Sequence, residues 1–511
     1  MNTLPRRLIP YIPVCTVCTC LFVFALILSP LQNPTSLGDG IRHLALAQIL
    51  HQGKQFGGWG DFVTSGYFSL HSSDPWYLTH LLITPLGALD TVLAQKIFIL
   101  ILGFAVGASF LLILSSLKIP SRMQSVCVLV LFLGNVQWML RLLLGRPVFM
   151  MVSLLLLLLL SFLQRKTWPL LPLMTIATLL SHLFVFPLFL CLLGSLWFVL
   201  QREYRKASCS MVYAALGVSV AFLLIPQNLN YVHYIAEVFL KVPFNVQLFT
   251  GTEMQSGIHR MAPIVVLLGA CTLFLRILRM QGRTTKEEMM ARGIVLTGTL
   301  VGFMTVGMLV WVRMLDFLWP LLLVLLAQIL SLCPSLPTEL ARYLLPKRVL
   351  KKRLAWAVLL LIIFVNIAKT EFTFLSTDAD RNLGQFADAF KEVPPQSRVL
   401  NLDWDLFPAL FTVRPDLLYT RGMDPSYDYL VSPHSIDLYS VIRTQTPDAV
   451  DWDNWLRELT QYVPSDVLVL WSANRSAVLN HLRTIPNLTL LRRNERIAVF
   501  KIATSLTHEK E

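Results

Sequence analysis

Charged residues are scarce in this sequence of 511 residues, because Asp, Glu, Lys and Arg make up only 14% of it. A water-soluble globular protein carries about 25%. This shortage, together with a hydrophobic content of 55%, excludes an ordinary cytosolic enzyme, a disordered chain and a secreted disulfide miniprotein. Several apolar runs are instead long enough to cross about 30 Å of hydrocarbon.

Acidic residues are few before residue 370, and the charge is therefore uneven along the chain. Residues 370–511 hold 14 Lys and Arg and 19 Asp and Glu, a net charge of −5, whereas the rest carries +18. The basic residues lie between hydrophobic runs, which indicates membrane topology and argues against a nucleic-acid partner. All eight cysteines precede residue 334, so residues 370–511 contain no disulfide.

The apolar runs predict eleven membrane-spanning helices, at about 9–29, 92–117, 123–140, 147–163, 168–182, 183–200, 208–225, 261–279, 294–312, 315–332 and 354–368. With the N-terminus in the cytoplasm, the cytoplasmic segments hold 20 Lys and Arg and the opposite side holds seven. The sequence therefore predicts a multi-pass plasma (inner) membrane protein. Its first loop, residues 31–91, and its C-terminal segment would be extracytoplasmic, on the periplasmic side of an inner membrane.

The C-terminal segment predicts a small α/β domain. Runs rich in Val, Ile and Leu predict strands at 398–402, 417–420, 466–471, 488–491 and 497–502, and helical patterns lie at 381–392, 433–444, 452–462 and 473–484. Asp451 and Ser472 are candidate helix N-caps. The predicted fold class is an α-helical polytopic membrane protein with about 11 transmembrane helices (residues 1–369) and a C-terminal extracytoplasmic α/β domain (residues 370–511).

Three polar residues open the first external loop at helical spacing. Asp39, Arg42 and His43 stand at i, i+3 and i+4, so they share one face of a predicted helix that continues to about residue 52. The apolar residues of that helix extend the same face, whereas solvated charges normally occupy the opposite one. The pattern therefore suits a functional site, and it equally suits a helix N-terminus where the dipole favours Asp39.

The rest of the loop, 59–76, mixes aromatic and polar residues. Such a mixture is typical of sugar binding, with apolar sugar faces on rings and hydroxyls on carboxylates. It is also typical of an interfacial aromatic belt. Asp61 and Asp74 are the further candidates for a carboxylate partner or a metal ligand in this loop.

The opening of the loop resembles the GT-C superfamily of polytopic membrane glycosyltransferases, which use polyprenyl-phosphate-linked sugars. The resemblance rests on an Asp that opens the first external loop, a helix, and a Pro-aromatic segment that returns to the membrane. It is carried by Gly38-Asp39, His43-Leu44-Ala45, Gly53 and Asp61-Phe62. The sequence is similar to protein O-mannosyltransferases and aminoarabinose transferases, and the opening is closest to that of uncharacterised bacterial members.

The resemblance implies that Asp39 is a general base, with Arg42 and His43 beside it, that takes the proton of an acceptor hydroxyl. The leaving phosphate needs cations on the external side. The candidates at the ends of spans are Arg141, Arg146, Arg260 and Arg313. Each of them is alternatively an interfacial anchor. Asp316 is a candidate with Arg313 or simply its ion partner, and His182 at a tight turn is a pocket residue or a structural hydrogen-bonding group.

The resemblance leaves the cofactor open. The second acidic pair of metal-dependent members is absent, so no metal ligand is assigned, although a divalent metal is not excluded. The implied partners are a polyprenyl-phosphate-linked sugar donor, membrane lipids, and a glycan, lipid or protein acceptor. Two other classes compete with a glycosyltransferase: a transporter or flippase of lipid-linked glycans, and a non-catalytic membrane scaffold. Neither internal symmetry nor paired broken helices, which are typical of transporters, stand out in the sequence.

Overall fold

The computed structural model describes most of the chain and divides it into two compact units. The described residues are 11–30, 40–240, 293–310, 314–332, 360–373, 383–422 and 431–503, without 445 and 474, together with residue 357 and parts of 264–272. The first unit comprises Met1–Leu31, Lys96–Leu223 and Thr252–Ser376, and the second comprises Gln32–Gln95, Leu224–Gly251 and Thr377–Glu511. Residues of the predicted loop 31–91 therefore share a unit with residues of the predicted domain 370–511.

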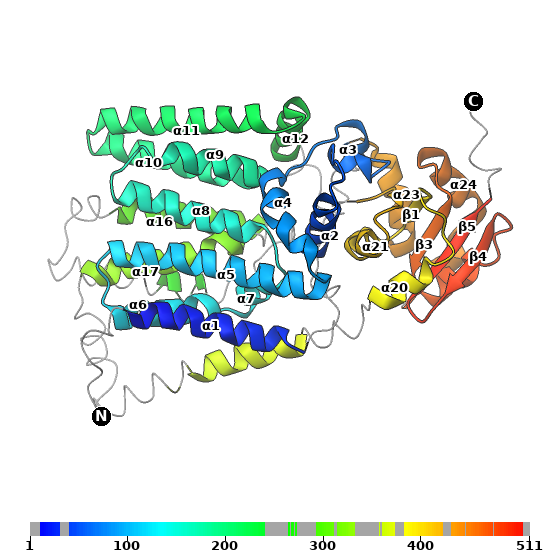
Figure 1. Ribbon diagram of the computed structural model, residues 1–511, viewed down its shortest axis with the longest axis horizontal. Helices are drawn as coiled ribbons and strands as arrows, with labels where there is room; N and C mark the ends of the chain where they lie inside the picture. The colour runs from blue at the N-terminus through cyan, green and yellow to red at the C-terminus, as the bar shows by residue number, and fades with distance from the viewer. Residues whose placement is uncertain are drawn as a thin grey trace. The chain divides into compact units, whose positions relative to one another are not determined.

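The first unit is built of apolar helices that run side by side (Figure 1). They are α1 (Ile12–Leu28), α5 (Thr91–Ser116), α6 (Ser121–Leu133), α7 (Val136–Leu143), α8 (Val148–Leu163), α9 (Leu170–Leu180), η5 (His182–Phe184), α10 (Val185–Leu200), α11 (Tyr204–Leu224), α16 (Ile294–Val310), α17 (Leu315–Leu332) and a helical segment at 360–373. The predicted spans that fall on described residues are helical over most of their length. A helix is the structure that satisfies all backbone polar groups within one apolar segment.

Three helices in the described part of the chain are long and apolar enough to cross a membrane. They are Thr91–Ser116, His182–Leu200 and Tyr204–Leu224. Along α11, apolar side chains such as Leu223 (79% exposed) lie on the surface of the unit, as expected for a helix that faces lipid. By contrast, α9 has 11 residues, about 16 Å at 1.5 Å per residue, which is too short to cross about 30 Å alone.

The predicted span 123–140 is not one straight helix. Its two parts, α6 and α7, meet at a bend of 71°. The break follows from the sequence Gly134-Asn135, because the Asn135 side chain caps α7 by accepting from the Trp138 backbone N–H at 3.1 Å. The last carbonyls of α6 find partners elsewhere in the unit. Trp319 Nε1 donates to the Leu131 carbonyl, and Asn366 Nδ2 donates to the Leu133 carbonyl.

The second unit combines short helices of the first loop with a five-stranded sheet. The helices are α2 (Gly40–His51), η3 (Trp59–Asp61), α3 (Tyr67–Leu70), α4 (Tyr77–Ile83), η4 (Thr84–Ala88), α12 (Asn228–Leu240), α20 (Leu383–Ala389), η8 (Trp404–Leu406), α21 (Phe407–Val413), α23 (Pro433–Thr444), η9 (Pro447–Ala449), α24 (Trp452–Tyr462) and α25 (Ser476–Leu482). The strands are β1 (Arg398–Asn401), β2 (Leu418–Tyr419), β3 (Val467–Trp471), β4 (Leu488–Arg493) and β5 (Ile497–Ile502). All five predicted strands are present.

The sheet has the order β2-β1-β3-β5-β4. Strand β1 runs parallel to β2 and β3, and β5 runs antiparallel to β3 and β4. Asp451 caps α24 as predicted, because its side chain accepts from the Asn454 backbone N–H. The prediction that Ser472 caps the next helix is wrong, because α25 starts at Ser476 after Arg475. The sequence analysis also missed α21, which follows β1 and η8.

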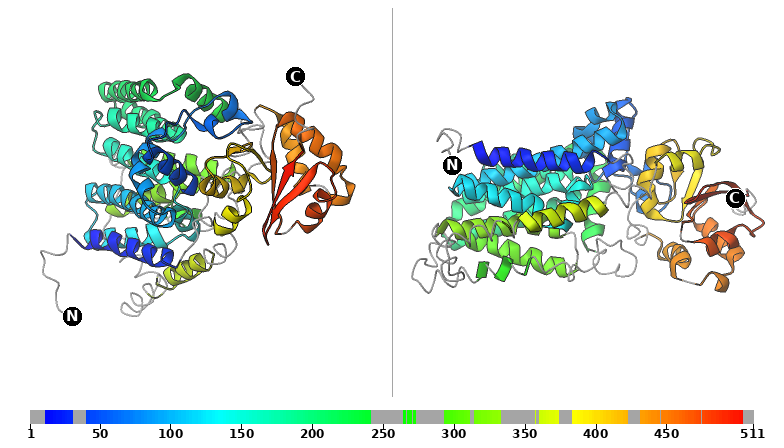
Figure 2. Two further views of the ribbon diagram at one scale, coloured as in Figure 1. Left: turned by 45° about the vertical axis from the view of Figure 1, so that its right-hand side comes forward. Right: turned by 90° about the horizontal axis from the view of Figure 1, so that it is seen from below.

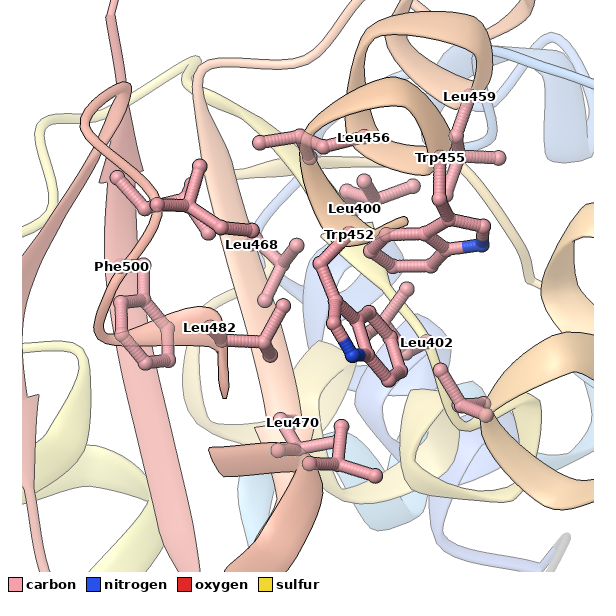
Figure 3. Packing of buried hydrophobic residues seen from close by; sticks show 14 of the residues in the cluster. Leu400, Leu402, Trp452, Trp455, Leu456, Leu459, Leu468, Leu470, Leu482 and Phe500 are labelled. Carbon is pink, nitrogen blue, oxygen red and sulfur yellow. The ribbon is translucent and has the colours of Figure 1, made fainter. Parts of the chain in front are cut away.

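Both faces of the sheet are covered by helices (Figure 2). On one face, leucines of β1 and β3 pack with Trp452 and Trp455 of α24 and Leu482 of α25 (Figure 3). Side chains alternate along a strand, so Trp471 of β3 lies on the other face, where its ring stacks on Phe386 of α20 at 6.0 Å between centroids. Burial on both faces explains the nearly continuous hydrophobic runs in the sequence.

The first loop extends this sheet at its β2 edge. Val63 pairs with Tyr419 as a parallel bridge. The Tyr419 backbone N–H donates to the Phe62 carbonyl at 2.7 Å, and the Thr64 N–H donates to the Tyr419 carbonyl at 2.8 Å. Gly422 is needed beside this junction, because a Cβ there would collide with the Val63 side chain. Residues about 355 positions apart in the sequence thus pair at one edge of the sheet in the second unit.

Candidate functional site

Helix α2 places two predicted site residues inside the second unit. From Gly40 to Ala47 every residue of α2 is buried, including Arg42 and His43. The sequence predicted burial of one face only. The helix is covered on more sides because α4, η4 and α21 all pack against it, and α21 comes from a distant part of the chain.

A continuous hydrogen-bonded chain of three buried side chains starts at His43. His43 Nδ1 lies 2.7 Å from His80 Nε2, and His80 Nδ1 lies 2.6 Å from Asp74 Oδ2. The other carboxylate oxygen, Asp74 Oδ1, accepts from the Trp76 backbone N–H at 3.0 Å. His43 and His80 are each 1% exposed and Asp74 is 6% exposed, so the whole chain is shielded from water.

Positive charge and aromatic rings surround this chain. The Arg42 guanidinium carbon lies 4.9 Å from the centroid of the Trp76 ring and 5.9 Å from that of Trp59, a cation–π arrangement. Burial lowers the pKa of His43 well below its usual value, and the positive charge of Arg42 and the neighbouring His80 lower it further. His43 is therefore held neutral.

Helix α12 contributes the tyrosine that faces Asp74. Tyr231 is buried, and its pKa is raised well above the usual value, first by burial and then by the negative charge of Asp74. No pattern in the sequence predicts this neighbour, because Tyr231 lies more than 150 residues after Asp74.

A second histidine cluster in the same unit is more open. Tyr67 Oη lies 2.7 Å from His233 Nδ1, and His233 Nε2 lies 3.8 Å from Glu237 Oε1. The His71 ring packs on the His233 ring at 4.4 Å between centroids. The His233 side chain is 47% exposed, and burial followed by the charge of Glu237 raises the pKa of Tyr67. Water screens this cluster, in contrast to the buried chain.

Asp61 does not join the buried chain. It is exposed, and its Oδ2 accepts from the Gly57 backbone N–H at 2.6 Å, which closes a local turn. Of the predicted carboxylates in the described part of the first loop, Asp74 is therefore the buried one.

The first unit contains four of the other predicted residues. Arg141 of α7 and Asp316 of α17 form a buried bidentate ion pair, with Nε to Oδ1 at 2.5 Å and Nη2 to Oδ2 at 2.7 Å. The sequence had offered Arg313 as the partner of Asp316. Arg146 is half-buried two residues before α8, and His182 is buried as the first residue of η5.

Three predicted residues, Asp39, Arg260 and Arg313, lie outside the described residues. Within the described ranges, no group of three or more His, Cys, Asp and Glu side chains is arranged to hold a metal ion. His80 was missed by the sequence analysis altogether. Its only signal was a histidine six residues after Asp74, across the Pro75-Trp76 break before α4.

The fold is that of a polytopic α-helical membrane protein with a C-terminal mixed-sheet domain, as predicted. The fold is that of ArnT from Cupriavidus metallidurans, a GT-C polytopic membrane glycosyltransferase. Its crystal structure bound to undecaprenyl phosphate matches with a TM-score of 0.55 and 12% identity, over 97% of this chain and 99% of that chain. The structure of the same protein in the apo state matches with a TM-score of 0.56, the same identity and the same coverage. No family model and no curated protein matches the sequence.

Proposed function

We propose that the protein is an integral-membrane glycosyltransferase that moves a sugar from a polyprenyl-phosphate donor to a hydroxyl group of a glycan, lipid or protein. The observation that carries this proposal is the fold shared with ArnT over nearly the whole chain, since that protein binds undecaprenyl phosphate. The buried Asp74–His80–His43 chain supports it, because two of its members, His43 and Asp74, belong to the loop on which the resemblance to glycosyltransferases rests.

In this proposal Asp39 is the general base. Its carboxylate takes the proton of the acceptor hydroxyl as the oxygen attacks the anomeric carbon of the sugar. The bond from that carbon to the phosphate oxygen breaks, and polyprenyl phosphate leaves with the bonding electrons. Arg42, three residues after Asp39 in the sequence, favours the ionised carboxylate through its positive charge.

The leaving phosphate needs a cationic partner. Both oxygens of Asp316 are bound by Arg141, so that guanidinium is committed to an ion pair. We therefore assign the phosphate to Arg146, Arg260 or Arg313, and expect Arg146→Ala or Arg313→Ala to weaken donor use more than Arg141→Lys. His182 is assigned to the same substrate cavity.

The extracytoplasmic location of the reaction rests on the distribution of basic residues. The predicted cytoplasmic segments hold 20 Lys and Arg against seven on the other side. A reporter enzyme that is active only outside the cytoplasm, fused after Glu511, should therefore be active. An inactive reporter on an intact protein would place the C-terminal domain in the cytoplasm and overturn this orientation.

The decisive test of the function is Asp39→Asn. The purified full-length protein in lipid would be given undecaprenyl-phosphate-linked pentoses and hexoses with membrane extracts, and release of undecaprenyl phosphate would be measured. Removal of a general base costs about 10²–10⁴-fold in rate. Asn caps a helix nearly as well as Asp, so a merely structural Asp39 would tolerate the change.

Asp90→Asn is the matched control. Asp90 is an exposed carboxylate that accepts from the backbone N–H groups of Val92 and Leu93 at the start of α5. This variant should keep near-normal transfer. Near-normal transfer by Asp39→Asn would remove Asp39 as the base, and binding of the donor without transfer by the wild type would favour a transporter.

A further inference from the structure

Two short turns of the first unit are bonded to each other through their side chains. The first joins α8 to α9, and the second joins α10 to α11. Arg165 of the first turn donates to Gln201 and Glu203 of the second, each at 2.5 Å. The two turns therefore form one surface, which we call the double turn and define as residues 164–169 and 201–206.

The double turn lies between segments that cross the membrane. His182–Leu200 and Tyr204–Leu224 are both long and apolar enough to span it, and only three residues separate them. A connection this short keeps both helix ends at the same membrane surface, where the hydrocarbon ends and the headgroups begin. Leu200 and Tyr204, on either side of the connection, are exposed on the unit. Acyl chains of neighbouring lipids can therefore lie directly beside the double turn.

Positive charge exceeds negative charge on the double turn. Its charged residues are five cations and one carboxylate, a net charge of +4: Arg165, Lys166, Arg202, Arg205 and Lys206, with Glu203. Glu203 binds two of the cations, since its Oε1 accepts from Arg165 and its Oε2 lies 3.0 Å from Lys206 Nζ. The carboxylate thus fixes two cationic side chains in place but neutralises the charge of only one.

The other three cations, Lys166, Arg202 and Arg205, are exposed. Over the described ranges of the chain, none of them forms an ion pair with a carboxylate. Basic side chains at the ends of neighbouring transmembrane helices attract anionic lipid headgroups. Arg and Lys bind phosphate oxygens through charge-assisted hydrogen bonds. The free charge of the double turn is therefore of the right sign and at the right depth for a phospholipid headgroup.

The backbone places two of the guanidiniums at an unusual position. Arg165 and Arg202 follow the ends of α8 and α10 in the left-handed conformation, with φ of 58° and 63°. Their N–H groups donate to the carbonyls of Phe162 and Val199, which closes each helix. Gly is the usual residue at such a position, because a Cβ is strained there. Membrane topology requires only a charge somewhere in the turn, so it does not account for Arg at the strained position.

We propose that the double turn binds the phosphodiester headgroup of an anionic phospholipid from the surrounding membrane. Lys166, Arg202 and Arg205 contact the phosphate oxygens, and the two cations held by Glu203 add to the positive field. The acyl chains lie along the exposed apolar side chains at the ends of α10 and α11. A zwitterionic lipid binds more weakly, because its ammonium group is repelled by the same cations. This site is separate from sugar transfer and does not rest on the proposed function.

The test measures lipid binding by native mass spectrometry. The purified full-length protein in detergent is titrated with phosphatidylglycerol and with phosphatidylcholine of the same acyl chains. One cation near a membrane surface strengthens the binding of anionic lipid about fivefold. We therefore expect Arg202→Gly to weaken phosphatidylglycerol binding about fivefold and Lys166→Gln/Arg205→Gln about 20-fold. Binding of phosphatidylcholine should hardly change. Equal affinity of the wild type for the two lipids would overturn the proposal.

Lys118→Gly is the matched control for Arg202→Gly. Lys118 is an exposed cation that follows α5 in the left-handed conformation, with φ of 55°, and its N–H donates to the Ser115 carbonyl. The control therefore removes the same charge from the same kind of turn outside the double turn. It should keep wild-type binding of phosphatidylglycerol. Equal weakening by the two variants would show that net charge alone attracts the lipid, and would overturn the site.

Thermal unfolding in detergent separates loss of binding from misfolding. Without added lipid, Arg202→Gly should unfold at the wild-type temperature or slightly above it, because Gly relieves the strained backbone. Added phosphatidylglycerol should raise the unfolding temperature of the wild type more than that of Lys166→Gln/Arg205→Gln. Equal stabilisation of both proteins would contradict the site. Glycerol phosphate, which lacks acyl chains, should not displace the lipid at equal concentration. Displacement would mean that the double turn binds free phosphate esters, contrary to a lipid site.

Discussion

Each of the two units buries an assembly of ionisable side chains, and the two assemblies differ in their hydrogen-bonding groups. In the first unit, Arg141 binds both oxygens of Asp316 through two parallel hydrogen bonds. A guanidinium stays protonated under all ordinary conditions, so this pair holds two helices together but passes no proton. Its geometry is bidentate, because Nε and Nη2 each donate to one oxygen of the carboxylate, and we call it the closed pair.

In the second unit, the chain from Asp74 through His80 to His43 is open at one end. Imidazole both donates and accepts hydrogen bonds, whereas a guanidinium only donates them. The comparison teaches that burial of charge alone does not mark a reactive site. The two assemblies differ in the basic side chain, which is a guanidinium in one and imidazoles in the other. They also differ because the histidine chain ends at His43, whose Nε2 has no hydrogen-bond partner among the described residues.

The largest expected effect comes from breaking the closed pair. Arg141→Ala leaves the carboxylate of Asp316, which is 1% exposed, without its cation. Loss of one partner of a buried pair costs about 3–5 kcal/mol, whereas replacement of both by apolar residues is often neutral. We expect Arg141→Ala to lower the free energy of unfolding by that amount, and Arg141→Met/Asp316→Leu to recover most of it. Unfolding of the purified full-length protein in detergent measures both.

Equal losses in Arg141→Ala and in the apolar double variant would contradict this account. They would show that packing of the two side chains matters, and that the stranded charge does not. Activity serves as a second readout, because a structural pair should change protein stability before it changes the rate of correctly folded molecules.

A smaller effect on the free energy of unfolding is expected when the pH is lowered, and it comes from His43 in the buried chain of the second unit. The folded protein holds the pKa of His43 well below the value of about 6.5 that it has in the unfolded chain. Below pH 6.5 the unfolded state therefore binds one more proton, and stability is lost as the pH falls. The free energy of unfolding should decrease by about 1.4 kcal/mol per pH unit through this group.

His43→Gln removes this titration, so the dependence between pH 6.5 and pH 5 should become weaker by about one proton. Arg141 keeps its charge over the same range and adds no such slope. An unchanged slope in His43→Gln would mean that His43 is protonated in the folded protein, contrary to the electrostatics of its site.

The sequence predicted the strands well because burial on both faces produces continuous apolar runs. It also identified the N-cap at Asp451, whose partner Asn454 is only three residues away. It missed α21 and the bend between α6 and α7. The bend has a local cause in the Asn135 cap, but the last carbonyls of α6 are bound by Trp319 and Asn366, which lie far away along the chain. Helix α21 packs against α2, which is also distant in the sequence.

For the candidate site, too, some features could be predicted from the sequence and others could not. Spacing on one helix was enough to single out Arg42 and His43, and composition pointed to Asp74. Spacing did not reveal that Asp74 reaches His43 through His80, because α2 and α4 meet only in the folded unit. Likewise, Arg141 and Asp316 are 175 residues apart, so only the tertiary structure shows that they pair.

The smallest effect is expected at a third ion pair, which sharpens the comparison because it lies at the surface of the first unit. Arg165 donates to Glu203 Oε1 and to Gln201 Oε1, each at 2.5 Å, but the Arg165 side chain is 35% exposed. Exposed pairs contribute about 0.2–1 kcal/mol. Lys206 also lies 3.0 Å from Glu203, so Arg165→Ala strands no charge. We expect a loss below about 1 kcal/mol that shrinks further in 1 M salt, where charges are screened beyond about 3 Å. A loss as large as that of Arg141→Ala would show that solvent exposure does not separate the two pairs.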